Sequence, residues 1–563
     1  MQNWVPTQRS RFFNPRLSKL LAALIVTSVA VTATAQTSSI TEPVTTVPAA
    51  VPATELSAVL EKGRRLESSD RWGEALSYYE ELLREHRDHE TLRQRYNFSK
   101  LHYSLDRRYR DRSFLVSIAS LNRKESLALF SELLQKTSTH YVDSPVWRTL
   151  GVRGTTAIEV ALADTDFLKA NNVHLTAAER AALRADLYRL LGGQNLSSSP
   201  KLIAFVSEVA RLLEARLKLN PTASILEFVA AAANGLDDYS AYLTADQLRE
   251  VYSQIEGNFV GLGVELKAEE GALLIVHVIP NSPAQRSGIQ AKDRIVAVDG
   301  KSTSEMSTDE AAAMLTGAEG TWVRVTAYTP GAQARVLNIR REHVEVPSLE
   351  GVRIVDTDLG IAYVRIPTFQ KATARDLEAA LWDLHRQGMR SLVLDLRGNP
   401  GGLLTSSVEV ADKFLTQGNI VSTRGRSVQE DFNYQATYGG TWRVPLVVLI
   451  DGDSASASEI FAGAIKDNNR GRVIGTTSYG KGSVQGIFPL GFAGAGIRLT
   501  TAKFFSPNGV PISHRGVEPH DLIEVYTVAK PGSTEFTTLG VDEKTDAILQ
   551  AGIAAARSRG ATR

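Results

Sequence analysis

Residues Val444 to Asp467 read VPLVVLIDGDSASASEIFAGAIKD, an apolar run followed by a polar turn and a helical pattern. The unbroken apolar run Leu446–Ile450 is typical of a buried strand, and Ser456 stands where the helix is expected to begin. The stretch SLVLDLRGNPGGLL, Ser391 to Leu404, has the same plan, and RVIG, Arg472 to Gly475, supplies a third strand. This repetition predicts a β/α core in the C-terminal half of the chain.

The segment that follows Tyr252 alternates apolar and polar residues, and Gly, Pro and Asp turns divide it into short strands. One amphipathic helix is expected at Thr308–Leu315, followed by strands at Trp322–Tyr328 and Ala334–Arg340. The segment resembles a PDZ domain, and the match rests on three motifs: GLGV (Gly261–Val264), SPAQRSGI (Ser282–Ile289) and DRIVAVDG (Asp293–Gly300).

In PDZ domains a glycine-rich turn presents backbone N–H groups to the terminal carboxylate of a peptide, which adds as an extra strand to the edge of the sheet. The resemblance therefore assigns peptide binding to Gly261, Leu262, Gly263 and Val264. Glycine suits this turn because the backbone must approach the ligand with no Cβ in the way. Lys292 departs from the family pattern, which has Gly before the Asp, so a differently shaped turn is expected there.

The sequence from Glu55 to about Asn234 is rich in Leu, Ala, Glu and Arg, with apolar residues three or four apart, which predicts helices. The stretch DRWGEALSYYEELLREHRDH, Asp70 to His89, resembles one tetratricopeptide unit. Because such repeats normally need several stacked copies, an ordinary helical hairpin is the alternative. The region is a candidate for docking an adaptor protein or for self-association.

The first 35 residues have the features of an export signal. A basic start ending at Lys19 precedes the apolar run Leu20–Ala33, and ATAQ, Ala33 to Gln36, offers small residues for cleavage after Ala35. The run is shorter than the ~20 residues that a membrane helix needs, and an uncleaved signal anchor is the alternative. No second stretch is long enough to span a membrane. Export to a periplasm or out of the cell is therefore predicted, and a flexible linker rich in Thr and Pro follows at 36–54.

The composition is that of an ordinary globular protein, with 43% hydrophobic and 22% charged residues among 563. The formal net charge of +1 indicates no nucleic-acid or membrane-surface partner. Because the chain has no cysteine, disulfides, thiolate zinc sites, a cysteine nucleophile and a lipoprotein anchor are excluded.

The stretch GTTSYGK, Gly475 to Lys481, begins like a nucleotide-binding P-loop. That loop needs Ser or Thr after the lysine and a helix behind it, so that the helix N-terminus faces the phosphates. Here Gly482 follows Lys481, and the sequence beyond it is glycine-broken and strand-like. The P-loop interpretation therefore fails, and neither a metal nor a nucleotide cofactor is expected.

If the protein is a serine hydrolase, a lysine is the candidate for its general base. The chain contains neither a GxSxG nucleophile elbow nor an HExxH zinc motif. A serine can use a lysine as its base when the lysine is desolvated, because a neutral amine accepts the hydroxyl proton and an ammonium cannot. The glycines on both sides of Lys481 would let the backbone pack tightly around such a base.

Five motifs that follow one another in order resemble the carboxyl-terminal processing (tail-specific) proteases, a Ser/Lys-dyad family with an inserted PDZ domain. The resemblance covers about residues 220 to 525 and leaves the helical N-terminal part outside. The motifs are LDDYSAYLTADQLREV (Leu236–Val251), the PDZ-like segment, DLRGNPGG (Asp395–Gly402), SASASEIFAGA (Ser454–Ala464) and YGKGSVQ (Tyr479–Gln485).

The resemblance implies a role for each matching residue. Ser456 would be the nucleophile, and Lys481, which follows it by 25 residues as in the family, would be the general base. Gln485 would hydrogen-bond the lysine and orient it. The backbone N–H groups of Ala457 and of Gly402, or of its neighbour Gly401, would form the oxyanion hole at predicted helix N-termini.

Alternatives accompany these roles. Ser456 and Glu459 form an S-x-x-E capping box, which needs no catalytic function. Asp395 is expected to fix the turn after its strand, and His514 or His520 leaves open a serine mechanism assisted by histidine. A non-catalytic scaffold built from a PDZ domain and helical repeats is the alternative to an enzyme.

The sequence therefore predicts a multidomain α+β protein, and the resemblance implies a β-barrel-like PDZ module inserted in a crotonase/Clp-like peptidase core. The expected function is that of an exported serine endopeptidase that binds apolar C-terminal tails of proteins. The expected parts are a signal (1–35), a linker (36–54), a helical region (55–219), a helical cap (220–256), the PDZ domain (257–343), the peptidase core (344–530) and a tail with a helix (531–563).

Overall fold

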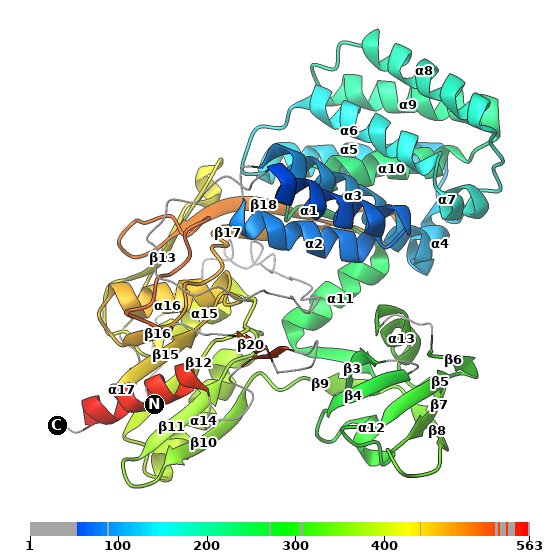
Figure 1. The fold of residues 1–563 in the computed structure, drawn as a ribbon. Helices are drawn as coiled ribbons and strands as arrows, with labels where there is room; N and C mark the ends of the chain where they lie inside the picture. The colour runs from blue at the N-terminus through cyan, green and yellow to red at the C-terminus, as the bar shows by residue number, and fades with distance from the viewer. Residues whose placement is uncertain are drawn as a thin grey trace, which may run out of the picture.

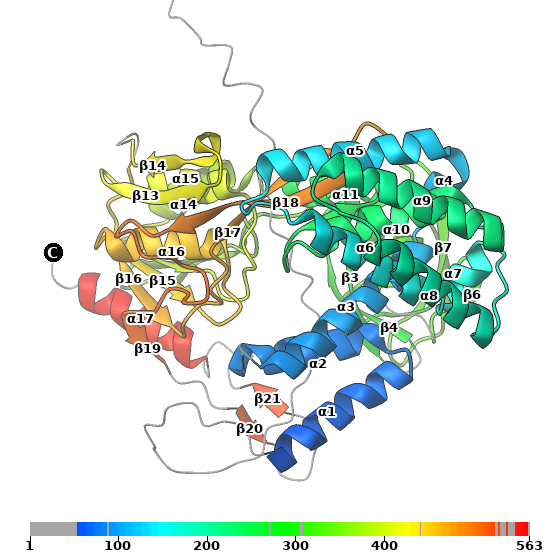
Figure 2. The ribbon, with the colours of Figure 1, turned by 90° about the horizontal axis from the view of Figure 1, so that it is seen from above.

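A computed structural model gives the fold in Figure 1 and, seen from above, in Figure 2. It describes residues 53–86, 89–269, 272–304, 308–437, 439, 441–523, 527–529, 536–538 and 546–560. The predicted export signal and nearly all of the linker lie outside these residues. Among the described helices, none is both long enough and apolar enough to cross a membrane.

Ten helices follow one another in the N-terminal part of the described chain. They are α1 (Ala53–Ser68), α2 (Trp72–Glu85), α3 (Glu90–Arg110), α4 (Arg112–Ser120), α5 (Arg123–His140), α6 (Trp147–Ala161), α7 (Thr165–Ala170), α8 (Ala177–Gly192), α9 (Ser199–Leu217) and α10 (Pro221–Asn234). The stretch that resembles a tetratricopeptide unit supplies α2, which forms a helical hairpin with α3.

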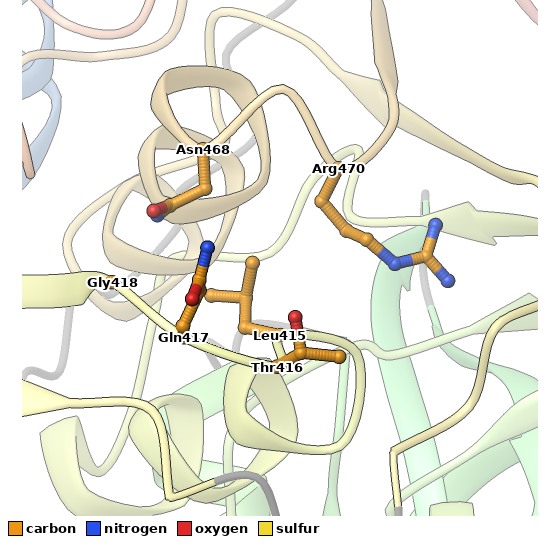
Figure 3. Close-up of a pocket in the computed structure, with 6 residues that line it drawn as sticks. All are labelled: Leu415, Thr416, Gln417, Gly418, Asn468 and Arg470. Carbon is orange, nitrogen blue, oxygen red and sulfur yellow. The ribbon is translucent and has the colours of Figure 1, made fainter.

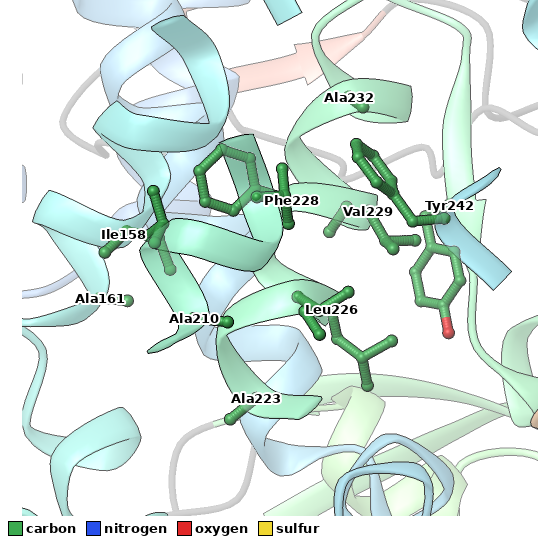
Figure 4. Packing of buried hydrophobic residues seen from close by; sticks show 14 of the residues in the cluster. Ile158, Ala161, Ala210, Ala223, Leu226, Phe228, Val229, Ala232 and Tyr242 are labelled. Atoms are coloured by element: carbon green, nitrogen blue, oxygen red, sulfur yellow. The ribbon is translucent and has the colours of Figure 1, made fainter. Parts of the chain in front are cut away.

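Helix α10 is the centre of this bundle (Figure 4). Its sequence is apolar on all sides, as expected of a helix that is covered all round. Phe228 of α10 packs edge-on against Phe205 of α9. The one charged residue of α10, Glu227, is fully buried and accepts a hydrogen bond from Arg108 of α3 at 2.6 Å.

The bundle shares its core with the C-terminal part of the chain. Ile497 and Leu499 of β18 (Gly496–Phe505) belong to the same buried cluster as α10. Strand β1 (Ala241–Leu243) pairs antiparallel with β18, and the Val142 N–H donates to Thr500 O at 2.8 Å. The helical region is therefore packed onto this sheet and is not a detached domain.

A PDZ-like module follows α11 (Ala245–Glu256). Its sheet has the order β3-β4-β5-β7-β8, with β6 beside β5, so that β3 and β8 are its terminal strands. The expected helix at Thr308–Leu315 and strand at Trp322–Tyr328 are confirmed. The elements are β3 (Val264–Glu269), β4 (Ala272–Val278), α12 (Pro283–Arg286), β5 (Arg294–Val298), β6 (Lys301–Ser302), α13 (Thr308–Leu315), β7 (Trp322–Tyr328) and β8 (Arg335–Arg340).

One feature joins the module to the rest of the chain, and another concerns the turn at Lys292. The ribbon of β2 (Asn258–Gly261) and β9 (Glu342–Glu345) joins it to the rest of the chain. Lys292 has a φ of 74°, the left-handed conformation that glycine adopts most readily, although it carries a side chain. The backbone there thus takes a conformation that suits glycine, despite the departure in sequence.

The C-terminal core is built on a six-stranded sheet with the order β10-β11-β12-β15-β16-β19, in which only β10 is antiparallel. The strands are β10 (Glu350–Asp356), β11 (Ile361–Arg365), β12 (Ser391–Asp395), β15 (Leu446–Ile450), β16 (Arg472–Gly475) and β19 (Asp521–Leu522). The strands predicted at Leu446–Ile450 and Arg472–Gly475 are confirmed.

Successive parallel strands of this sheet are neighbours, so right-handed crossovers bring their connecting helices to one face. Helices α14 (Thr373–Arg386), α15 (Leu404–Asp412) and α16 (Ala457–Asp467) bury that face, and α17 (Ala547–Gly560) covers the other. The loops after β12 and β15 therefore meet at the carboxyl edge of the sheet, where ligands of open α/β sheets bind.

A second sheet has the order β1-β18-β13-β14, with β17 also paired to β18. Its remaining strands are β13 (Asn419–Gly425), β14 (Phe432–Gln435) and β17 (Ser483–Pro489), with a 3-10 turn at Val428–Glu430. Strands β20 (Thr527–Ala529) and β21 (Phe536–Thr538) form a separate pair. Because β17 follows Lys481, the strand expected there is confirmed and no helix stands behind the lysine to complete a P-loop.

Candidate active site

Ser456 lies at the carboxyl edge of the core sheet, as the N-cap residue of α16. Its backbone has φ 55° and ψ −110°, a conformation that costs a non-glycine residue about 1–3 kcal/mol and persists where surrounding contacts impose it. Neighbouring hydrogen bonds supply the constraint: Ser454 Oγ donates to Leu396 O at 2.9 Å, and Ser458 Oγ donates to Asn399 O at 3.0 Å. The strained strand-to-helix turn presents Ser456 in the manner of a nucleophile elbow without the GxSxG sequence.

Glu459 connects this turn to the loop that carries Lys481. Its side chain is fully buried, and one carboxylate oxygen accepts from Ser456 N at 2.7 Å and from Lys481 N at 2.9 Å. The other oxygen accepts from Gly480 N at 2.7 Å and from Ser478 Oγ at 2.6 Å. Burial raises the pKa of Glu459, and these four hydrogen bonds oppose the rise. The S-x-x-E pattern is thus more than a helix cap, because the same carboxylate fixes the backbone of both dyad candidates.

Lys481 is buried between β16 and β17, with 5% of its surface exposed, beside 4% for Ser456. Burial, and then the positive charge of Arg498, lower the pKa of Lys481 to about 7, although Glu459 and more distant carboxylates oppose the shift. On that shift, the charged form is disfavoured by roughly 5 kcal/mol relative to water. A substantial neutral fraction of the amine is therefore available near neutral pH.

The flanking glycines permit this burial. A Cβ at Gly482 would lie 2.2 Å from Ser513 N, which is closer than any real contact. Gly480 has a φ of 91°, and its Cβ would lie 3.1 Å from Arg515 N. The tight packing expected around Lys481 is confirmed.

Gln485 lies on β17 and is buried, but its contacts differ from those that the resemblance implies. Its Nε2 donates to Ser483 Oγ at 2.9 Å, and its Oε1 is buried without a hydrogen-bond partner. Lys481 Nζ instead lies 4.5 Å from the ring centroid of Tyr239. Among the described residues, no hydrogen bond joins Lys481 Nζ to Ser456 or to Gln485 in this conformation.

Two backbone N–H groups at the turn fit the predicted oxyanion hole. Within the described chain, neither the Ala457 N–H nor the Gly402 N–H donates a hydrogen bond. Gly401 is different, because its N–H donates to Asn399 Oδ1 at 2.8 Å. A Cβ on Gly401 would lie 2.9 Å from Ser456 Cβ, so the glycine turn packs directly on the serine. The Gly401 N–H is therefore already used within the turn, whereas the Gly402 N–H has no acceptor among the described residues.

The turn Gly261–Val264 lies at the terminal strand of the PDZ-like sheet. Gly263 has a φ of 81°, and its Cβ would lie 2.3 Å from Ser282 Cβ, so no side chain fits there. The carbonyls of Leu262 and Gly263 accept hydrogen bonds from Ala284 and Ile279. Their own N–H groups donate to none of the described residues, which leaves two donors beside the open edge of β3.

The remaining polar candidates have structural partners. Asp395 accepts from Tyr363 Oη at 2.8 Å and is paired with Arg397, as expected of a residue that fixes the turn. His520 Nδ1 accepts from Val473 N at 3.0 Å, beside the pairing of β16 with β19. His514 has a φ of 62°, and its N–H donates to Gly480 O at 2.8 Å. Both histidines thus take part in backbone contacts near β16 and the loop of Lys481.

A pocket of about 350 Å³ lies elsewhere on the core (Figure 3). Its lining includes Arg470 and Asn468, yet both side chains are engaged with the main chain. Arg470 donates to the carbonyls of Phe414, Trp442 and Val444, and Asn468 Nδ2 donates to Asn419 O and Ala464 O. The residues that line this pocket include neither Ser456 nor Lys481, and its polar side chains serve the packing of the core.

Sequence comparison matches two families. Residues 360–523 match "Peptidase family S41", and residues 253–327 match "PDZ domain". The chain is 39% identical over 295 residues to a carboxy-terminal-processing protease of Bartonella bacilliformis, covering 51% of this chain and 67% of the relative. It is 34% identical over 286 residues to the carboxy-terminal processing protease CtpB of Bacillus subtilis, covering 50% of this chain and 59% of that relative.

Among solved structures, the photosystem II D1 C-terminal processing protease is 24% identical to this chain, with a TM-score of 0.37. The match covers 71% of this chain and 93% of that protein. On the strength of the sequence relatives, this chain belongs to the carboxy-terminal processing proteases of peptidase family S41, and it is a serine-type peptidase with a PDZ domain.

Proposed function

We propose that the protein is an exported endopeptidase that captures apolar C-terminal tails of proteins on its PDZ domain and cleaves them with a Ser456/Lys481 dyad. The observation that carries the chemistry is the buried carboxylate of Glu459. It accepts hydrogen bonds from the backbone N–H groups of both Ser456 and Lys481. It therefore fixes the position of the strained serine relative to the desolvated lysine. Export is supported by the sequence of residues 1–35 alone.

In the proposed reaction, Ser456 Oγ attacks the scissile carbonyl carbon while the neutral amine of Lys481 takes the hydroxyl proton. The carbonyl oxygen becomes an oxyanion, which the N–H groups of Ala457 and Gly402 receive. Lys481 then gives its proton to the leaving amine as the C–N bond breaks, which leaves the acyl group as an ester on Ser456. Water, deprotonated by Lys481, cleaves the ester and restores the serine.

Lys481 Nζ packs against the Tyr239 ring, so the lysine has to turn toward Ser456 for the reaction to begin. Catalytic hydrogen bonds are commonly long in free enzymes and tighten in the substrate complex. The unpartnered Oε1 of Gln485 supports its proposed role, because it is an acceptor available to a lysine that turns toward Ser456. Since neutral lysine is the working form, activity is expected to fall below about pH 7.

Tail recognition is supported by the Leu262 and Gly263 N–H groups and by the open edge of β3. These donors would bind the terminal carboxylate, while the extended tail pairs with β3. Binding of an adaptor or of a second copy by the helical region stays a prediction.

A matched pair of peptide substrates tests whether the enzyme recognises the C-terminal carboxylate. A peptide with an apolar C-terminus and a free carboxylate is compared with the same peptide amidated at its C-terminus. Loss of the carboxylate is expected to lower kcat/KM about tenfold or more, since each lost charge-assisted hydrogen bond costs about 1.5–3 kcal/mol. Equal kcat/KM values for the two peptides would contradict tail recognition through the PDZ domain.

A further inference from the structure

The hairpin of α2 and α3 reaches the candidate active site, although it lies outside the residues that match the two families. Glu80 of α2 accepts a hydrogen bond from Tyr479 Oη at 3.4 Å, two residues before Lys481. In Figure 1 the hairpin lies at the lower edge of the helical region, facing the peptidase core. The helical region therefore contributes to the surroundings of the lysine.

A second set of contacts joins α3 to the segment 236–240, which precedes β1. Arg93 Nη1 lies 3.3 Å from Asp238 Oδ2, and Lys100 Nζ lies 3.7 Å from Asp238 Oδ1. Lys100 Nζ also donates to Asp237 O at 3.3 Å. These two side chains thus join α3 to the turn.

The segment 236–240 places Tyr239 on the lysine. Asp237 Oδ1 accepts from Tyr239 N at 2.7 Å and from Ser240 N at 2.6 Å, which closes the turn. Arg498 Nε donates to Tyr239 O at 2.8 Å. The Tyr239 ring then lies over Lys481 Nζ, at 4.5 Å from the ring centroid, and Lys481 is buried.

The hairpin has a core of its own, and one end of α3 is anchored in the bundle. Ala75, Tyr79, Leu83, Leu92 and Tyr96 form a small core of its own, distinct from the core of the bundle. The far end of α3 is fixed in the bundle by the buried pair of Arg108 and Glu227. Lys100 lies eight residues before Arg108, about 12 Å along the helix. The contacts of Arg93 and Lys100 therefore hold the part of α3 that projects from the bundle.

We propose that Arg93 and Lys100 are positioning residues of the peptidase, which hold the segment 236–240 so that the Tyr239 ring keeps water away from Lys481. The proposal rests on the proposed function, in which Lys481 is the general base. It gives the helical region a part in catalysis, because the residues that shield the base are held by α3. Tyr239, Arg93 and Lys100 all lie outside residues 360–523, which match the peptidase family.

The expected consequence is a change in the ionisation of the base. Burial is the largest influence on Lys481, so hydration of its amine raises its pKa from about 7 toward that of a free lysine. A rise of one unit lowers the neutral fraction at pH 7 about fivefold. The charged and titratable groups around Lys481 are Arg498 on β18, Glu459 on α16, Glu80 on α2, Asp237 and Tyr239 in the segment 236–240, and, beyond these, Lys100 and Asp238.

The test is the pH profile of kcat and KM on a tail peptide between pH 5.5 and 9.5, for the full chain and for the double variant Arg93→Ala/Lys100→Ala. The acid limb of the variant is expected about one pH unit higher, with kcat reduced about fivefold at pH 7 and restored at pH 9. KM is expected to stay unchanged. The matched control, Arg184→Ala/Lys201→Ala, removes the same charges from α8 and α9, where Arg184 pairs with Glu159 and Lys201 with Ser197.

Two single variants separate positioning from charge. Asp238→Asn breaks the same ion pairs but removes a negative charge, which by itself would move the limb to lower pH. If Arg93 and Lys100 act by positioning, its limb moves to higher pH. Tyr239→Phe keeps the ring and is expected to keep the wild-type limb, while Tyr239→Ala is expected to reproduce the shift of the double variant. If the double variant does not fold, the shift of the acid limb in these single variants tests the proposal instead.

An unmoved acid limb in the double variant and in Tyr239→Ala overturns the proposal, and so does a loss of activity at every pH without a shift. Higher activity at pH 7 overturns it as well, because the hairpin would then block the site. These outcomes differ from failure of the proposed function, in which Lys481→Met would retain activity with a wild-type limb.

Discussion

The Ser456→Ala variant is expected to lose about 10⁴-fold or more in kcat on a tail peptide, with little change in KM. Without the hydroxyl no acyl-enzyme forms, and only binding and oxyanion stabilisation remain to assist attack by water. The substitution should leave the fold intact, because α16 is held by Glu459 and by the hydroxyls of Ser454 and Ser458. Steady-state cleavage by purified variant and wild type gives the comparison.

Ser406→Ala is the matched control, since it removes a hydroxyl that is also buried in the core and has no hydrogen-bond partner. It is expected to retain wild-type kcat. Residual cleavage by Ser456→Ala above a hundredth of the wild-type rate would rule out Ser456 as the nucleophile.

Lys481→Met and Lys481→Arg are both expected to lower kcat by about 10³–10⁴-fold. Methionine fills the buried site without an amine, and arginine keeps the charge but has no neutral form at working pH. The loss in the arginine variant would show that the amine acts as a base and not as a fixed positive charge. Cleavage rates from pH 5.5 to 9.5 provide the measurement.

Wild type should show an acid limb near pH 7 in this series, because the amine must lose its proton before it can work. Lys466→Met on α16 is the control and is expected to behave as wild type, since its amine donates to the backbone oxygen of Glu518. Full activity in Lys481→Arg would contradict the account of the base.

Local sequence patterns were sufficient to predict the strands of the core, while the roles of Ser456 and Lys481 came from the family resemblance. The apolar runs Leu446–Ile450 and Arg472–Gly475 could be recognised as buried strands, and Ser456 at the following helix start has a local signature. The glycines around Lys481 indicated close backbone packing, which the structure confirms. Such features depend on neighbours in the sequence, so they are visible without a fold.

The contacts that tune the site were not predictable in the same way. Tyr239, Arg498 and Glu80 approach Lys481 from parts of the chain far apart in sequence, through the pairing of β1 with β18 and the packing of α2. The four hydrogen bonds of Glu459 require the loop before β17 to fold back on α16, whereas the sequence showed only a capping box. The hydrogen bond from Gln485 to Ser483 was also not expected, because the resemblance pointed to a bond with the lysine instead.

Mass spectrometry of the enzyme, quenched in acid during turnover of a tail peptide, tests the central claim most directly. The account predicts that the N-terminal part of the cleaved peptide is attached to the proteolytic fragment that contains Ser456, as an ester that Ser456→Ala does not form. An acyl group on another residue, or continued turnover by Ser456→Ala, would contradict it.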